Sequence, residues 1–220
     1  MAVIVFFLTC RAMALPITGA APDSLTEEQS KLLNGEVIVA LSNRQEGVTG
    51  VEGQIYIAAH PKKVWEVLTD YNNHKFFIPN VIDSGMISEN GDEKVMFEKG
   101  KSRIFIFQKE VYIKMKVWGE NPKRLFFEQI SGDFKVYHGE WILSDYPQGA
   151  GTFLTYKAEI KPDFYAPQFA IKRVQQHDCP LMLSAMKKQA ESSSAFEQKK
   201  GEKLTRIGKT ESELPLLEQE

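Results

Sequence analysis

Histidine side chains are the first candidates for acid–base chemistry in this sequence, because imidazole titrates near neutral pH. The chain has four of them, at His60, His74, His138 and His177. His60 precedes the expected start of a helix, His74 lies in the polar turn NNHK, and His177 adjoins an expected helix break. For these three we expect surface or capping roles and no catalysis.

His138 has an environment that leaves two interpretations open. Alternation along FKVYHGEWIL groups His138 with Glu140 on one face of a strand. If this pair points inward, it could hydrogen-bond the polar head of a ligand, and if it points outward, it is an ordinary solvated pair. The outward orientation is favoured, because such residues are mostly exposed. The opposite set is equally apolar and consists of Tyr137, Trp141 and Leu143.

Metal, nucleotide and nucleic-acid sites find no support in the sequence. No His, Cys, Asp or Glu residues have a spacing typical of zinc sites, and two cysteines are too few for the thiolate versions. The glycine motifs of phosphate and dinucleotide loops are absent, so no cofactor is expected. A net charge of -2 and a pI near 6.1 give no electrostatic reason to expect a nucleic-acid partner. An enzyme is therefore the weaker hypothesis, and no residue is assigned as catalytic.

The N-terminal sequence MAVIVFFLTCRAMALPITGA is typical of an exported protein. Its apolar run from Ala2 to Leu8 is too short to span a bilayer, and Ala12 and Ala14 form an Ala-x-Ala cleavage motif. No Lys or Arg precedes the run, which is atypical. Residues 1–21 are predicted to be a signal peptide and linker, and the protein to be periplasmic or secreted; otherwise it is cytoplasmic.

Local patterns predict a helix, two strands and a second helix up to Tyr71. Ser24 and Glu27 have capping-box spacing, which predicts a surface helix, and EVIVAL then predicts a strand, so residues 22–46 form an N-terminal helix and strand. Alternation in GVEGQIYIAA predicts the second strand. Pro61 can start a helix without losing a hydrogen bond, and apolar residues recur after it at helical spacing.

The middle of the chain predicts about six antiparallel strands. Turn sequences recur at ENGDE, ENPKR, ISGDF and YPQGAG without helical periodicity between them. Alternation in KEVYIKMKVW places Val111, Ile113 and Met115 on one face. In GTFLTYKAEI it likewise groups Leu154 with Tyr156. Each of these strands should bury one face and expose the other.

The C-terminal part is predicted to supply a helix that covers the sheet. PQFAIKRVQQ predicts one segment and Asp178 can start another, so we expect a long helix kinked or broken near Cys179. Met182 and Met186 share its apolar face, while the lysines and the glutamate of KKQAE should look to water. Residues 192–220 are rich in charge and predict a disordered tail.

Three stretches carry a family resemblance: IYIAAHPKKVWEVLTDYNNHKFFIPNV, YHGEWILSDYPQGAGTFLTYKAEIKP and LMLSAMKKQAE. With them the chain resembles the START-like, polyketide cyclase and dehydrase superfamily (SRPBCC), and is most similar to the subfamily of coenzyme Q-binding proteins and the ribosome-association toxin. The resemblance covers residues 47–191. It implies an α+β helix-grip fold, in which a curved antiparallel β-sheet is wrapped around a long C-terminal α-helix.

The resemblance also implies a hydrophobic cavity between sheet and helix, with its mouth near residues 70–80. Members of the superfamily bind lipids, sterols, quinones or polyketides, so we expect a monomer that binds a hydrophobic small molecule or lipid, with transient membrane contact as an option. The apolar walls suit such a ligand. The candidate ligand-binding residues are Phe76, Phe77, Ile78, Val111, Ile113, Met115, Leu154, Tyr156, Arg173, Met182 and Met186.

Three alternatives stay open at this point. The same apolar residues could pack on one another as a solid core. A cyclase or dehydrase could act in the cavity with Tyr156, His138 or Glu140 as proton carriers. A protein-interaction module could use the solvated strand face and the tail. Fold alone does not choose among them.

Overall fold

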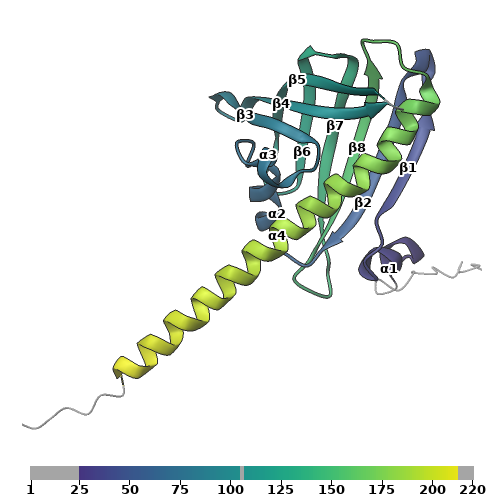
Figure 1. The fold of residues 1–220 in the computed structure, drawn as a ribbon. Helices are drawn as coiled ribbons and strands as arrows, with labels where there is room; N and C mark the ends of the chain where they lie inside the picture. The colour runs from purple at the N-terminus through teal and green to yellow at the C-terminus, as the bar shows by residue number, and fades with distance from the viewer. Residues whose placement is uncertain (1–24, 105–106, 213–220) are drawn as a thin grey trace, which may run out of the picture.

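One curved antiparallel sheet and one long helix make up most of the protein. The computed structural model describes residues 25–104 and 107–212, with the backbone alone for residues 102–104, 107–108 and 193–212. The predicted signal peptide lies outside this part of the chain. Within it, eight strands form one sheet in the order β1-β2-β8-β7-β6-β5-β4-β3, and α4 crosses one face of that sheet (Figure 1). The predicted helix-grip fold is confirmed.

The six strands from β3 to β8 agree with the number predicted for the middle of the chain. The strands are β1 Ile38–Asn43, β2 Thr49–Ile57, β3 Val81–Asn90, β4 Glu93–Ile104, β5 Phe107–Glu120, β6 Arg124–Gly132, β7 Phe134–Asp145 and β8 Thr152–Pro162. The helices are α1 Glu27–Leu33, the short 3-10 helix η1 Gln45–Gly47, α2 Pro61–Leu68, α3 His74–Phe77 and α4 Gln168–Ser212.

The first helix has a different cap from the one predicted. Thr26 Oγ1 accepts the amide proton of Gln29 at 3.1 Å, and Gln29 Oε1 accepts that of Thr26 at 3.0 Å. The capping box is thus Thr26–Gln29, and Ser24 lies outside the described residues. Both pairs have the required spacing in the sequence, so spacing alone does not choose between them.

The predicted break near Cys179 was wrong, because α4 runs without interruption through Pro180. Proline removes one helical hydrogen bond. Packing offsets that loss, since the buried residues on both sides of Pro180 lie on one stripe of the helix and face the sheet. The stripe consists of Cys179, Leu183, Met186 and Ala190, all at most 3% exposed.

The C-terminal tail also differs from the prediction. The sequence after residue 192 predicted disorder, whereas α4 continues to Ser212 and extends away from the sheet (Figure 1). Residues 213–220 lie outside the described chain. The helical backbone beyond the body of the fold therefore adds no wall to the space between α4 and the sheet.

A glycine allows α4 to approach β2 closely. A Cβ at Gly53 would lie 2.6 Å from Cys179 Sγ and 2.9 Å from Leu183 Cδ1. Only a residue without a side chain leaves room for the helix at this separation. Gly53 therefore fixes how closely the helix lies against the sheet.

Two side chains then hold α4 to the end of β2. Lys187 Nζ donates to the carbonyl oxygen of Tyr56 at 2.7 Å, and Glu191 Oε1 accepts the amide proton of Ala58 at 2.8 Å. Both side chains were expected to face water. They instead pair with backbone groups just where β2 ends, and thereby fasten the helix.

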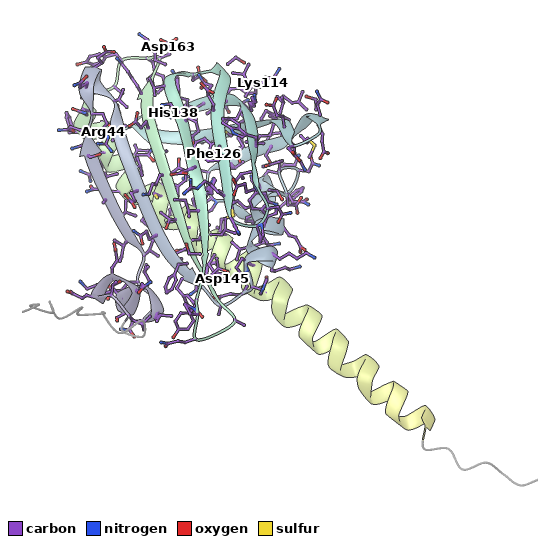
Figure 2. All side chains as sticks on the ribbon, turned by 180° about the vertical axis from the view of Figure 1, so that it is seen from behind. Arg44, Lys114, Phe126, His138, Asp145 and Asp163 are labelled. Atoms are coloured by element: carbon purple, nitrogen blue, oxygen red, sulfur yellow. The ribbon has the colours of Figure 1, made fainter. Side chains whose placement is uncertain are left out.

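The two faces of the sheet differ as the alternation predicted. Tyr137, Trp141 and Leu143 face α4, whereas His138 is half exposed and lies with Glu159 on the opposite face, 3.7 Å away (Figure 2). Glu140 pairs with Arg124 on that outer face as well. The outward orientation of His138 and Glu140 is therefore confirmed.

Candidate functional site

A cavity of about 260 Å³ lies between α4 and the inner face of the sheet. Its walls come from β4 to β8, from α3 with the residues on either side of it, and from the first half of α4. Most of the walls are apolar. Seven of the predicted ligand-binding residues line it, namely Ile78, Val111, Ile113, Met115, Tyr156, Met182 and Met186.

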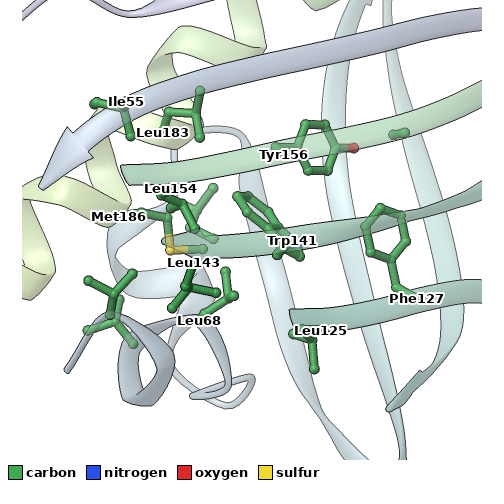
Figure 3. Packing of buried hydrophobic residues seen from close by; sticks show 14 of the residues in the cluster. Ile55, Leu68, Leu125, Phe127, Trp141, Leu143, Leu154, Tyr156, Leu183 and Met186 are labelled. Carbon is green, nitrogen blue, oxygen red and sulfur yellow. The ribbon is translucent and has the colours of Figure 1, made fainter. Parts of the chain in front are cut away.

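The other four predicted residues do not line the cavity. Leu154 is fully buried near Leu183 and Met186 but does not itself line the cavity (Figure 3). Arg173 is exposed on α4. Alternation identifies the inward face of a strand but does not tell a packed position from one beside a cavity.

Phe76 and Phe77 were grouped with Ile78 at the mouth, and the structure separates the three. Phe76 is 76% exposed, Phe77 is half-buried against the core, and Ile78 is buried and lines the cavity. The reason is that α3 is one helical turn, and successive helical residues point about 100° apart.

A pair of tyrosines forms one polar patch in the wall. The hydroxyl oxygens of Tyr137 and Tyr156 lie 3.2 Å apart and hydrogen-bond each other. The ring of Phe127 stacks on Tyr156 at 5.9 Å between centroids, and Trp141 packs against it at 4.6 Å. Burial raises the pKa of Tyr137 to about 12 and that of Tyr156 well above its ordinary value, so both hydroxyls stay protonated at neutral pH.

His74 and Glu98 form a second polar patch. His74 Nδ1 lies 2.8 Å from Glu98 Oε1, and the histidine is only 4% exposed. The prediction of a surface or capping role for His74 was therefore wrong. Its ring packs edge to face between Tyr71 and Phe77, with centroids 5.6 and 5.7 Å away. The two aromatic rings thus bury a residue that a polar sequence had suggested was exposed.

Glu98 was missed by the sequence analysis. It lies on β4 between Met96 and Gly100 at the inward positions, opposite Ile113 on β5. The period of two in KVMFEKGK groups it with Met96, so a carboxylate at an apolar position was visible in the sequence. Sequence alone does not supply its partner, because His74 is 24 residues away.

Two buried polar atoms of this patch remain without a hydrogen bond to any residue whose side chain the structure describes. They are His74 Nε2 and the hydroxyl of Tyr71. Leaving such an atom unpaired costs about 1–3 kcal/mol. Burial, and then the charge of Glu98, raises the pKa of Tyr71, so that its hydroxyl remains a donor. The patch can therefore make further hydrogen bonds.

Family membership follows from the match of residues 57–187 to the family described as polyketide cyclase / dehydrase and lipid transport. The chain belongs to this family. No functionally curated protein matches its sequence. The curved antiparallel sheet with α4 across one face agrees with this membership.

Three solved structures illustrate the shared fold of the family. The Zhui aromatase/cyclase from Streptomyces sp. R1128 has a TM-score of 0.57 and 16% identity, over 66% of this chain and 94% of its own. A START superfamily protein from Mycobacterium smegmatis has a TM-score of 0.57 and 12% identity, over 65% of this chain and 97% of its own. The STAR-related lipid transfer protein (fragment 25–204) from Xanthomonas axonopodis has a TM-score of 0.52 and 14% identity, over 69% of this chain and 98% of its own. At these identities the likeness shows the fold alone.

The mouth of this family member's cavity is built around Asn80. Its φ of 67° is left-handed, a conformation that asparagine tolerates better than most residues. The carbonyl oxygen of Asn80 accepts the amide proton of Lys101 at 2.8 Å, and Asn80 Nδ2 donates to Asp178 Oδ1 at 3.3 Å. One exposed residue thus ties the loop after α3 to both β4 and α4 where the cavity reaches solvent.

Metal binding and membrane spanning have no support in the described ranges, residues 25–104 and 107–212. Among the side chains that the structure describes there, no three His, Cys, Asp or Glu residues are placed to hold a metal ion. No helix within those ranges has both the length and the apolar character needed to cross a membrane.

Alkaline pH should destabilise the fold through the buried tyrosines. The pKa of Tyr137 is about 12 when folded and ordinarily near 10, so the folded chain holds this proton more tightly. The contribution of the Tyr137 proton to stability is fully present below pH 10 and is lost as the pH rises toward 12. This loss lowers the free energy of unfolding by about 2 kcal/mol. Urea denaturation at fixed pH should show a shallower decline for Tyr137→Phe. The exposed Tyr165→Phe is the control, and equal declines for all three proteins would contradict the assignment.

Proposed function

We propose that the protein binds a hydrophobic small molecule, a lipid, quinone or polyketide-like compound, as a monomeric exported carrier that does not convert its ligand. The observation that carries the proposal is the apolar cavity between sheet and α4. Export rests on the N-terminal sequence. Binding pockets combine apolar walls with a few polar groups that orient the guest, and this cavity has two such patches.

The cavity walls suit a ligand without a rigid shape. Met96, Met115, Met182 and Met186 line it, and methionine adapts to irregular apolar surfaces. The match to a family whose description includes lipid transport, and the fold shared with a STAR-related lipid transfer protein, support the same proposal. Native mass spectrometry of the purified protein, followed by solvent extraction, tests it directly by showing whether an apolar compound is bound.

Filling the cavity should abolish binding without unfolding the protein. Val111→Trp puts a large side chain into the cavity from β5, and the matched control Tyr112→Trp puts one on the opposite face of the same strand. We expect the affinity for a fluorescent fatty-acid analogue to fall at least about tenfold in the first variant and to stay unchanged in the second. Equal affinities would show that the ligand binds elsewhere.

A second candidate function, a cyclase- or dehydrase-type enzyme, is favoured by the His74–Glu98 pair. The residues first considered for it, His138 and Glu140, lie on the outer face and cannot reach the cavity. In the neutral ring, Nδ1–H donates to the carboxylate, and Nε2 is then able to accept a proton from a bound molecule. Such a pair within an apolar cavity is an acid–base device as well as a binding group.

Removing the charge of Glu98 separates carrier from enzyme. Glu98→Gln keeps an oxygen acceptor for His74 Nδ1–H, but without the carboxylate charge His74 is a weaker base. Any conversion of the ligand should therefore slow about a hundredfold. The measurement is the mass of the extracted ligand before and after incubation with wild type, Glu98→Gln and the surface control Glu52→Gln. Loss of water from the ligand in wild type and Glu52→Gln only would establish the enzyme, and an unchanged ligand throughout would support the carrier.

Transient membrane contact is proposed through Phe76. Its ring is 76% exposed one helical turn from residues that line the cavity, and Lys75 lies beside it. Phe76→Asp should leave thermal stability unchanged and lower co-sedimentation with anionic phosphatidylglycerol vesicles severalfold. Phe77→Asp, which buries a charge against the core, should instead lower the melting temperature. Undiminished co-sedimentation of Phe76→Asp would refute the contact.

A further inference from the structure

The hydrogen-bonding capacity of one cavity wall specifies the head group that the ligand carries. Tyr71 is 3% exposed and His74 4%, both line the cavity, and neither Tyr71 Oη nor His74 Nε2 has a hydrogen-bond partner among the side chains and backbone that the structure describes. The two rings touch edge to face at 5.6 Å. The two residues therefore belong to one patch of the wall.

The roles of the two atoms follow from their surroundings. In the neutral ring, Nδ1–H of His74 donates a hydrogen bond to the carboxylate of Glu98 at 2.8 Å, because a carboxylate can only accept, and Nε2 is then the acceptor of the ring. The phenol of Tyr71 is a donor that can also accept. The patch thus offers an acceptor and a donor, in walls that are otherwise mostly apolar.

We infer that the ligand bears a hydroxyl group, as an apolar alcohol or phenol, which donates to His74 Nε2 and accepts from the hydroxyl of Tyr71. This inference rests on the proposed binding function and adds the chemical class of the ligand. A hydroxyl satisfies both atoms because it is donor and acceptor at once. A ketone or ether accepts from Tyr71 but leaves the imidazole nitrogen unpaired.

A carboxylate fits this patch poorly. It has no proton to give to Nε2, and it would lie beside the negative charge of Glu98 in a largely apolar cavity. Lys101 also lines the cavity, but it is exposed at the mouth, three residues along β4 from Glu98. An anionic head group would therefore be drawn to the mouth and away from the His74 patch.

The Tyr137–Tyr156 pair is the other polar patch of the cavity wall, and it differs from the Tyr71–His74 patch in its hydrogen bonding. These hydroxyls line the same cavity but already satisfy each other at 3.2 Å. They offer no unmet hydrogen bond that would select a head group. Removing the Tyr137 hydroxyl would leave that of Tyr156 unpaired, so the control is Tyr112, which is exposed on the outer face of the sheet. Removing the hydroxyl of Tyr112 should leave head-group selection unchanged, whereas removing that of Tyr71 should not.

The test compares three probes of nearly the same size on the full chain by isothermal titration calorimetry: 2-naphthol, 2-methoxynaphthalene and 2-naphthoate. Wild type should bind 2-naphthol about tenfold more tightly than the other two. Tyr71→Phe, which removes one oxygen atom, should bring the ratio of naphthol to methyl ether close to one. His74→Asn keeps a donor for Glu98 but lacks Nε2, and should do the same. Tyr112→Phe, on the outer face, should retain the wild-type ratio.

Three other outcomes would contradict the inference, and one of them would also contradict the proposed function. Equal affinities of wild type for 2-naphthol and its methyl ether, or tightest binding of 2-naphthoate, overturn the hydroxyl assignment and leave the proposed carrier function standing. If Tyr71→Phe keeps the wild-type ratio of affinities for 2-naphthol and its methyl ether, the hydroxyl assignment is overturned as well, even if His74→Asn does not fold. Failure of wild type to bind any of the three naphthalenes overturns both the inference and the proposed function.

Discussion

The packing of α4 on β2 is the contact on which the rest of the structure depends. Gly53 lets Cys179 and Leu183 lie directly against the strand, and the bonds of Lys187 and Glu191 to the β2 backbone fix the helix there. Because α4 is held against β2 at one side of a curved sheet, the strands farther from β2 are the ones that can leave a space between the sheet and the helix. The tight contact and the cavity are consequences of the same geometry.

Aromatic rings explain how that space stays open. A protein interior tends to close-pack, and a cavity persists only where its lining cannot relax into it. Phe127 and Trp141 are held against Tyr156, and Tyr156 is hydrogen-bonded to Tyr137, so each ring is fixed by its neighbours (Figure 3). The opposite wall contains methionines, which adapt to a guest. One wall is rigid and the other compliant, as a selective but tolerant binding site requires.

Sequence patterns predicted those parts of the site that depend on a local period. The inward positions of β5 and β8, including Val111, Ile113 and Tyr156, follow from alternation alone. The patterns failed where tertiary packing decides: the rotation of a single helical turn buried His74 and exposed Phe76. Likewise, packing on both sides of Pro180 carried α4 through a residue that usually ends a helix. The pairing of His74 with Glu98 joins two such positions, which is why no local pattern revealed it.

The His74–Glu98 pair is costly in the place where it lies. Burying a carboxylate and an imidazole away from water costs free energy, and here Nε2 and the Tyr71 hydroxyl add two unpaired atoms. Nothing in the attachment of α4 needs this patch, because Gly53, Lys187 and Glu191 hold the helix at β2 and the adjoining residue Ala58. Local departures from the rules of stable packing are expected at functional sites. Because the stabilising contacts and the unpaired polar atoms lie in different parts of the molecule, the patch is best explained by what the cavity binds.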